Sequence, residues 1–409
     1  MPEGSSLSAR QAIAALGPLG YRIGICDPNP LCLCRFSRFV SEFNRSPALG
    51  RDPLGYWRFL LSLVKQKKYD VLLPVHEHAF LFSRMRNTLS KYIHVAVAGF
   101  DSFQRAQSKA AFMKLLDELN LPHPSTKMLS TVSELGQMDD FPYYVKSEFG
   151  TAGTGVWLVK NTSDRTTVMA RLDQLKLPSA ESAVMVQKAA PGVLEVCQSV
   201  FDRGELLAWH CYQQRAQGVG GSASARIGVD RPVVAEHLRK IGTALNWHGS
   251  LMLDYIRNPE NEEINYIEAN PRMGETMNAT LNGVNLADLL VRVSLNQKPG
   301  PVKRQNKPAV ESHTLMGNIL GIAHRRGSRG AILKELERAF FDADRYAKSE
   351  EEIARGEDAV SFLPLLAVSA ELIFDPERSE KIARKAVSDY SLTPAAIKII
   401  SNLPDSENA

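Results

Sequence analysis

The sequence has no long uninterrupted hydrophobic run. Its most apolar stretch, residues 359–370, is broken by Ser361 and Pro364 and ends at Glu371. A membrane-spanning helix needs about 20 consecutive apolar residues, and the N-terminal residues lack the basic start of a secretory signal. We therefore expect a cytoplasmic protein without a membrane partner.

Cysteine is also scarce. The five cysteines are an odd number with no C-x-x-C pair, and no second Cys or His pair accompanies Cys32 and Cys34 at zinc-finger spacing. A disulfide scaffold or a structural zinc site would need such pairs. This cysteine usage is typical of a reducing compartment.

Neither sign of charge dominates the chain. Lys and Arg total 49 while Asp and Glu total 45, a net charge of +4, and the basic clusters are short and scattered. A nucleic-acid partner is therefore not expected. The 409 residues, of which 44% are hydrophobic, suffice for two to four compact units with buried cores.

The first 100 residues alternate between predicted helices and predicted strands. The helices are 8–16 and 57–64, and the strands are 21–27, 70–74 and 93–98. Such alternation indicates an open α/β domain, residues 1–100, built on a parallel sheet. Only three residues precede the loop that begins at Gly4, so we expect the sheet to lack the first strand that such domains usually have.

Residues 101–300 predict a second, mixed unit. The patterns place a helix at 109–120 and strands at 143–146, 156–159, 184–187, 196–201, 206–212, 250–256 and 263–268. Polar turns join several consecutive strands, which favours antiparallel pairing and an α+β fold. We expect residues 301–409 to be mainly helical with one strand at 367–374, and to pack on the preceding unit or form the interface of a homodimer.

Two predicted strand ends carry the strongest set of polar residues. Asp254 lies on one strand, while Glu268, Asn270 and Arg272 follow along the next. Period-two alternation places Glu268 and Asn270 on one face, and a hairpin would bring Asp254 beside them. Such oxygen ligands suit Mg²⁺ bound with substrate phosphates, and an arginine can stabilise a phosphoryl group in transfer. An ordinary strand-end acid and turn is the alternative for this motif alone.

A glycine-rich segment lies between two predicted strands. Gly150, Gly153, Thr154 and Gly155 follow Lys146 closely in the sequence. The backbone N–H groups of such a loop can approach phosphate oxygens, and the lysine adds a positive charge. The segment is neither a Walker A loop nor a dinucleotide fingerprint. A flexible turn without a ligand is the alternative for this motif alone.

Together and in this order, these features resemble the ATP-grasp superfamily, in particular its carbamoyl-phosphate-synthetase-like branch, over residues 5–300. The resemblance implies an α/β N-terminal domain followed by an α+β ATP-grasp unit of two subdomains, residues 101–300. The mainly helical C-terminal region lies outside it.

The resemblance also implies roles for individual residues. Lys109 and Lys146 would contact the ATP phosphates with Gly150, Gly153, Thr154 and Gly155; Gln187, Lys188, Ala189 and Ala190 would lie beside the adenine; Glu195 would bind the ribose; Asp254, Glu268 and Asn270 would hold Mg²⁺ or Mn²⁺; and Arg272 would lie near the γ-phosphate. Lys188 stands where the family often has an acid, so we expect backbone groups to contact the adenine there.

The activity implied is that of an ATP- and Mg²⁺-dependent ligase. It would transfer the γ-phosphoryl group to a small-molecule carboxylate, and an amine would attack the acyl phosphate. Arg272 and Lys146 would act in this transfer, and Arg226 would hold the acceptor carboxylate or be a solvated surface residue. Segments 150–155 and 217–226 are expected lids. A bicarbonate-activating carboxylase or carbamoyl-phosphate-type enzyme, or a non-catalytic nucleotide-binding scaffold, are the alternatives.

Overall fold

The computed structural model describes residues 1–407 except 151, 152, 154, 180, 181, 298, 300–308, 342–348, 354 and 355. Its helices are α1 (Leu7–Leu16), α2 (Pro53–Gln66), α3 (His78–Arg84), α4 (Arg86–Leu89), α5 (Phe100–Gln107), α6 (Lys109–Glu118), α7 (Thr162–Leu175), α8 (Pro232–Leu245), α9 (Met277–Leu281), α10 (Leu286–Ser294), α11 (Leu315–Arg326), α12 (Arg329–Phe341), α14 (Leu363–Phe374), α15 (Ser379–Tyr390) and α16 (Pro394–Asn402). Its strands are β1 (Ile23–Asp27), β2 (Val40–Arg45), β3 (Thr126–Leu129), β4 (Tyr143–Ser147), β5 (Val156–Val159), β6 (Val184–Lys188), β7 (Val193–Asp202), β8 (Glu205–Gln217), β9 (Ala223–Val229), β10 (Gly249–Arg257), β11 (Ile264–Asn270), β12 (Glu311–His313) and β13 (Ser349–Glu351).

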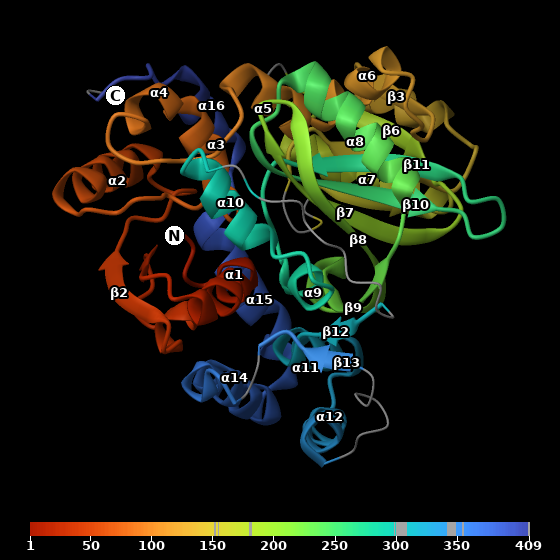
Figure 1. Ribbon diagram of the computed structural model, residues 1–409. Helices are drawn as coiled ribbons and strands as arrows, with labels where there is room; N and C mark the ends of the chain where they lie inside the picture. The colour runs from red at the N-terminus through yellow and green to blue at the C-terminus, as the bar shows by residue number, and fades with distance from the viewer. Residues whose placement is uncertain are drawn as a thin grey trace.

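The described strands form three sheets. A large sheet has the order β11-β10-β7-β8-β9-β12-β13, a four-stranded sheet has the order β3-β6-β4-β5, and β1 pairs with β2 alone. The four-stranded sheet is antiparallel throughout. In Figure 1 the N-terminal helices lie on the left, the two larger sheets at the upper right, and α11, α12 and α14 below them.

The helices of the N-terminal region begin where the sequence predicts. Ser6 caps α1 by accepting a hydrogen bond from the backbone of Ala9, and Ser108 caps α6 in the same way through Ala111. Such caps satisfy N–H groups that have no partner inside the helix. The expected helices at 8–16, 57–64 and 109–120 are thus confirmed within a few residues.

The N-terminal sheet is smaller than predicted. The expected strands 70–74 and 93–98 are wrong in extent, because they meet only at a single parallel bridge between Val71 and His94. Pro74 has no N–H group with which to continue the ladder. Along β1, the backbone of Met1 hydrogen-bonds to Gly24 and Cys26 at 2.8 and 3.0 Å, in place of a further strand.

The predicted strand at 367–374 is also wrong. These residues belong to α14, which has Pro364 in its first turn and buries Leu365, Ser369 and Leu372 on one face. A proline at the start is compatible with a helix, and the spacing of the buried residues is helical. A short apolar run alone does not distinguish a helix from a buried strand.

The hydrophobic core crosses the expected boundaries between units. One cluster of buried residues joins Trp57 of α2, Phe112 of α6 and Leu253 of β10 to Ile400 of α16. Helix α16 packs against α2 and α3, although more than 300 residues separate them in the sequence. Helix α16 is therefore part of the same core as the first 300 residues, whereas α11, α12 and α14 bury residues in a separate cluster.

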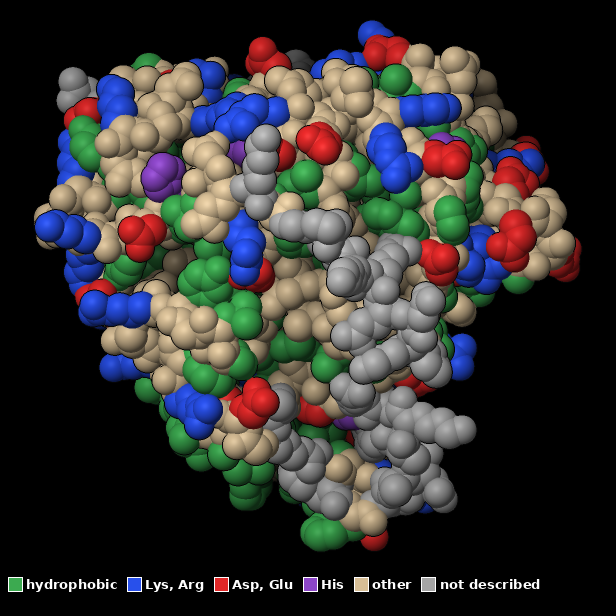
Figure 2. All heavy atoms as spheres, viewed as in Figure 1, with side chains coloured by type: hydrophobic (Ala, Val, Ile, Leu, Met, Phe, Trp, Pro, Cys, Tyr) green, Lys and Arg blue, Asp and Glu red, His purple; other side chains and the backbone are tan. Residues whose placement is uncertain are grey.

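Among the described residues, no helix combines the length and apolar character needed to cross a bilayer. On the face seen in Figure 2, basic and acidic side chains are interspersed over the upper part of the molecule, and hydrophobic side chains gather towards the lower left. Helix α14 has two exposed leucines, Leu363 and Leu366.

Candidate active site

A cavity of about 840 Å³ lies against one face of the large sheet. Most of the lining from this sheet consists of alternate residues on four strands: Glu268 and Asn270 of β11, Met252 and Asp254 of β10, Leu194 and Val196 of β7, and Tyr212 and Gln214 of β8. Ala223 and Arg226 of β9 also line the cavity. Because side chains alternate between the two faces of a strand, this face presents carboxylate and amide groups at one end and apolar groups in the middle.

Two carboxylates meet directly on this face. Asp254 of β10 lies opposite Glu268 of β11 in the antiparallel register, and Asn270 follows on the same side of β11. This is the juxtaposition that the strand alternation predicts. The pairing of these two consecutive strands therefore brings together the three residues that the sequence singles out as metal ligands.

The environment of Asp254 is favourable for a cation. Its Oδ1 atom is buried and has no hydrogen-bond partner, and burial, followed by the charge of Glu268, raises the pKa of Asp254 to about 7. A divalent ion between the two carboxylates would supply the missing partner and keep both charged. The described residues contain no cluster of three or more His, Cys, Asp or Glu with metal-binding geometry, so the fit depends on two carboxylates, Asn270 and ligand oxygens.

Two buried lysines flank the carboxylates. The Nζ atom of Lys109, the first residue of α6, lies 3.0 Å from Oε1 of Glu268. Lys146 of β4 donates to Oε1 of Gln187 at 2.6 Å and to the backbone oxygen of Ile267 at 3.4 Å. Burial lowers the pKa of Lys146 to about 8, although the charge of Glu268 partly offsets this effect. Helix α6 and the four-stranded sheet thus bring positive charge close to the carboxylate pair of the large sheet.

Arg272 lies at the same end and links it to the N-terminal region. Its Nη1 atom is 2.9 Å from Oε1 of Glu77, a carboxylate that is almost completely buried. The neighbouring His76 lines the cavity, and burial together with the charge of Arg272 lowers its pKa to about 3. His76 is therefore neutral at physiological pH, whereas the side chain of His78 is buried against Glu3.

The two expected lid segments meet over the cavity. Gly150 and Gly153 line it on one side, and residues 219–223 line it on the other. A Cβ atom placed on Gly153, which has a φ of +76°, would lie 3.2 Å from the carbonyl oxygen of Gly220. Gly155 has a φ of +75°. A left-handed conformation favours glycine at both positions, while Thr154 lies outside the described residues.

The segment expected beside the adenine follows β6. Gln187 is buried and donates to Oγ1 of Thr126 at 3.1 Å, and Lys188 points to solvent, where it pairs with Asp140 at 2.9 Å. Ala189 and Ala190 form the half-buried connection to β7. None of these four residues lines the cavity, so their contact with a nucleotide stays a prediction.

The structure does not support the ribose-binding role expected for Glu195. Its carboxylate is fully buried on the opposite face of β7, where it accepts hydrogen bonds from Arg231, Arg257 and Tyr255 at 2.8–3.0 Å. Burial alone would raise the pKa of Glu195, but the two arginines hold it below its ordinary value. Leu194 faces the cavity instead.

A Glu195→Ala variant should therefore lose stability rather than nucleotide affinity. Removing the carboxylate leaves Arg231 and Arg257 without their shared partner, and breaking such a buried pair costs about 3–5 kcal/mol. Urea unfolding should show this loss, while calorimetric titration of the folded variant should give an unchanged Kd for ATP. A large rise in the Kd without loss of stability would restore the ribose role.

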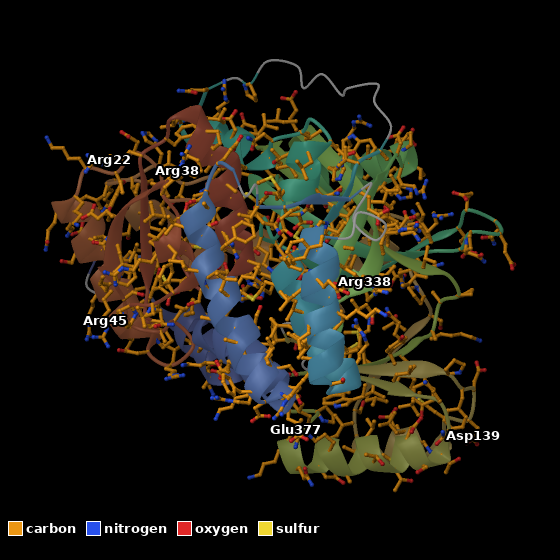
Figure 3. The ribbon with its side chains drawn as sticks, turned by 90° about the horizontal axis from the view of Figure 1, so that it is seen from below. Arg22, Arg38, Arg45, Asp139, Arg338 and Glu377 are labelled. Carbon is orange, nitrogen blue, oxygen red and sulfur yellow. The ribbon has the colours of Figure 1, made fainter. Side chains whose placement is uncertain are left out.

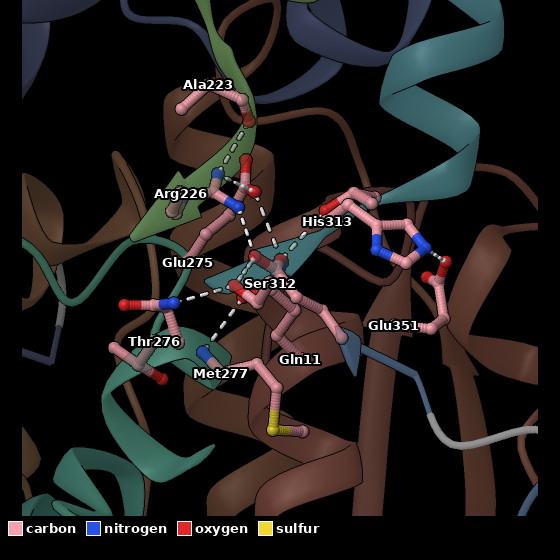
Figure 4. Close-up of polar contacts among 12 residues, drawn as sticks. Gln11, Ala223, Arg226, Glu275, Thr276, Met277, Ser312, His313 and Glu351 are labelled. Atoms are coloured by element: carbon pink, nitrogen blue, oxygen red, sulfur yellow. Dashed lines mark hydrogen bonds and ion pairs between the residues drawn. The ribbon is translucent and has the colours of Figure 1, made fainter. Parts of the chain in front are cut away.

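The structure also corrects the expectation for Arg226. Its Nη1 atom lies 2.6 Å from Glu352, and its Nη2 atom lies 2.5 Å from Glu275 and 2.8 Å from the backbone oxygen of Ala223. Figure 4 shows this cluster, which Gln11 of α1 joins. Arg226 is therefore not a solvated surface residue: it is 2% exposed and lines the cavity. Both of its terminal nitrogens already pair with protein carboxylates, and its contact with a substrate carboxylate stays a prediction.

One wall of the cavity comes from the C-terminal region, for which the sequence predicts no chemistry. Residues of α11, α14 and α15 line it, among them Met316, Leu320, Val368, Lys381 and Lys385. Their helical spacing gives no sign that they reach a site built on strands earlier in the chain. The packing of α11 against β9 and α15 brings them there.

No protein-family model matches the sequence, but several solved structures have a similar fold. N5-carboxyaminoimidazole synthetase from Staphylococcus aureus, complexed with ADP, matches with a TM-score of 0.60 and 15% identity over 80% of this chain and 84% of the other. L-amino acid ligase from Bacillus licheniformis matches with a TM-score of 0.60 and 12% identity, over 76% and 79% of the two chains. Biotin carboxylase from Campylobacter jejuni matches with a TM-score of 0.62 and 12% identity, over 76% and 74%.

Each match covers about three quarters or more of the chain. The sequence identities are low, so the likeness concerns the path of the backbone. The structure is a mixture of helix and sheet in which a cavity with paired carboxylates and buried lysines lies beside a glycine-rich hairpin. The chain has the ATP-grasp fold.

Proposed function

We propose that this protein is an ATP- and Mg²⁺-dependent ligase that activates a carboxylate as an acyl phosphate and joins it to an amine, with release of ADP. The observation that carries the proposal is the register of β10 and β11, which sets Asp254 opposite Glu268 beside Lys109. The solved enzymes of similar fold include a synthetase bound to ADP and an amino-acid ligase, which supports this class of reaction.

The phosphate end of the site would lie over the two carboxylates. Asp254, Glu268 and Asn270 would hold the metal, which when bound neutralises phosphate charge. Lys109 and Lys146 would bind phosphate oxygens together with backbone N–H groups at Gly150, Gly153 and Gly155. The lowered pKa of Lys146, about 8, still leaves most of this residue protonated at neutral pH.

Arg272 would hold the phosphoryl group during its transfer. Its guanidinium pairs with Glu77 and lies near both Asp254 and His76, where the acceptor carboxylate would enter. An acyl phosphate hydrolyses in water, so the reaction needs a closed site. The contact between Gly153 and Gly220 joins the two glycine-rich loops over the cavity and would exclude solvent there.

ADP release with pairs of acids and amines tests the proposal. We expect turnover only when both are present, with hydroxylamine as a general nucleophile for trapping the acyl phosphate. Glu268→Gln should reduce turnover by roughly 10²–10³-fold, because it removes a charge at the phosphate end. The exposed Glu205 offers a matched control, Glu205→Gln, which should behave like the wild type.

Two other outcomes would replace the proposal. ATP binding without ADP release against any acid and amine would favour a nucleotide-binding scaffold. Turnover that requires bicarbonate, and no other acid, would favour a carboxylase or a carbamoyl-phosphate-type enzyme.

A further inference from the structure

The cavity has a second end, far in sequence from the carboxylate pair, that combines apolar and basic residues. Its apolar lining there includes Met316 and Leu320 of α11, and Val368 of α14. Lys381 and Lys385 of α15 line the same cavity. Helix α15 packs on α11 and lies beside the 219–221 loop, which lines the cavity as well.

The two lysines have no ion-pair partner among the described residues. Both are exposed, and neither forms an ion pair with a described residue, whereas Arg378 pairs with Glu371 at 2.8 Å and Arg384 pairs with Glu380. Lysines four residues apart share one face of a helix, and two like charges at this spacing destabilise it. An anion bound between Lys381 and Lys385 would relieve that repulsion.

The size of the cavity leaves room for such a ligand. At about 840 Å³, its volume lies near the upper end of the usual ~300–1,000 Å³ range for ligand sites. The phosphates of a nucleotide would occupy only the end that Asp254 and Glu268 line. A substrate whose reacting carboxylate lies near Arg272 would extend past Met316, Leu320 and Val368 towards α15. Apolar walls bind an apolar chain, and the lysines bind a negative group at its far end.

We infer that the carboxylic acid activated by this protein carries an apolar chain and a second anionic group, a carboxylate or a phosphate, which Lys381 and Lys385 bind. This inference rests on the proposed function, because it assigns the reacting carboxylate to the Arg272 end. It also gives the C-terminal helices a role in substrate selection. Figure 3 shows this region from below, with Glu377 labelled next to the start of α15 and Arg338 on α12.

Binding of matched probes tests the inference without requiring turnover. The full-length protein, with a non-hydrolysable ATP analogue and Mg²⁺, is titrated by calorimetry with octanoate, octanedioate and ω-phosphonooctanoate. We expect both dianions to bind about ten-fold or more tightly than octanoate, because a second charge gains a basic partner. Whichever of the two dianions binds more tightly then identifies the second group as a carboxylate or a phosphate.

A charge-reversed variant separates this site from general attraction. In Lys381→Glu/Lys385→Glu the preference for dianions should disappear, while binding of octanoate stays within about two-fold. The control Lys334→Glu changes an exposed lysine of α12 that does not line the cavity, and should keep the preference. Equal binding of all three probes by the wild type, binding of none of them, or a preference that survives the double substitution would overturn the inference.

Failure of the proposed function gives a different result. If the dianion preference depends on the two lysines but no acid and amine release ADP, the anion site stands and the ligase activity does not. If only acids with a single negative charge support ADP release, and the double substitution leaves the KM for these acids unchanged, the ligase activity is supported. The assigned substrate class is then wrong.

Discussion

A chain that ends before residue 301 should fail to give a folded, monodisperse protein. Truncation removes Glu352, which pairs with Arg226, a residue that is only 2% exposed. It also removes Ile400 of α16 from the main core, and loss of one such side chain alone costs about 2–5 kcal/mol. These losses together approach the ~5–15 kcal/mol by which a whole protein is stable.

Size-exclusion chromatography and thermal unfolding of the truncated chain measure this effect. We expect aggregated material without a cooperative transition. Glu352→Gln in the full chain isolates the electrostatic contribution of this pair, because glutamine keeps the shape of the side chain but leaves the buried guanidinium of Arg226 with one carboxylate. The free energy of unfolding should fall by about 3–5 kcal/mol. A truncated chain that unfolds cooperatively and binds ATP would show instead that the C-terminal region is a separable module.

The local elements of the central unit could be predicted from the sequence. The hairpins between 143 and 159 and between 250 and 268 each contain two alternating apolar runs joined by a turn, so pairing and register follow from short-range pattern. This is why the approach of Asp254 to Glu268 was predictable. Both residues lie on one hairpin, and no distant contact is needed to bring them together.

Roles that depend on distant contacts could not be predicted. Val196 faces the cavity because β7 pairs with β10, where it lies opposite Asp254, and this pairing turns Glu195 to the other face. Glu352 reaches Arg226 across 126 residues of sequence. Neither contact leaves a trace in composition, spacing or local propensity. The sequence therefore could not show that Glu195 turns away from the cavity, or that Arg226, which lines it, is already paired with two protein carboxylates.

The C-terminal wall of the cavity was missed for a related reason. Residues 363–374 form an apolar run whose length suits either a strand or a short helix, and only tertiary packing decides between them. The pattern of α15 is that of an ordinary amphipathic helix with charged residues on its outer face. That Lys381 and Lys385 line a cavity depends on where α11 places the helix.

Replacing Asp254 with asparagine should raise the stability of the metal-free protein at neutral pH while abolishing turnover. Burial and Glu268 raise the pKa of Asp254 from 3.8 to about 7 in the folded protein. The folded state therefore binds a proton more tightly than the unfolded state, and this contribution to stability, fully present below pH 4, is lost as the pH rises through 7. Asparagine carries no charge and has no such loss.

Melting temperatures in EDTA between pH 4 and pH 8.5 provide the measurement. The difference between Asp254→Asn and the wild type should be small at the acidic end, grow through the intervening range and level off above pH 7. The exposed Asp173 of α7 supplies the control, since Asp173→Asn should show no such trend. With Mg²⁺ and ATP present, the wild type should have the higher melting temperature. It gains the free energy of ligand binding, whereas the variant lacks a charge that the metal needs. A variant that is less stable than the wild type at pH 8 without metal would mean that Lys109, Lys146 and Arg272 already stabilise the Asp254 carboxylate, and that the site is formed without a cation.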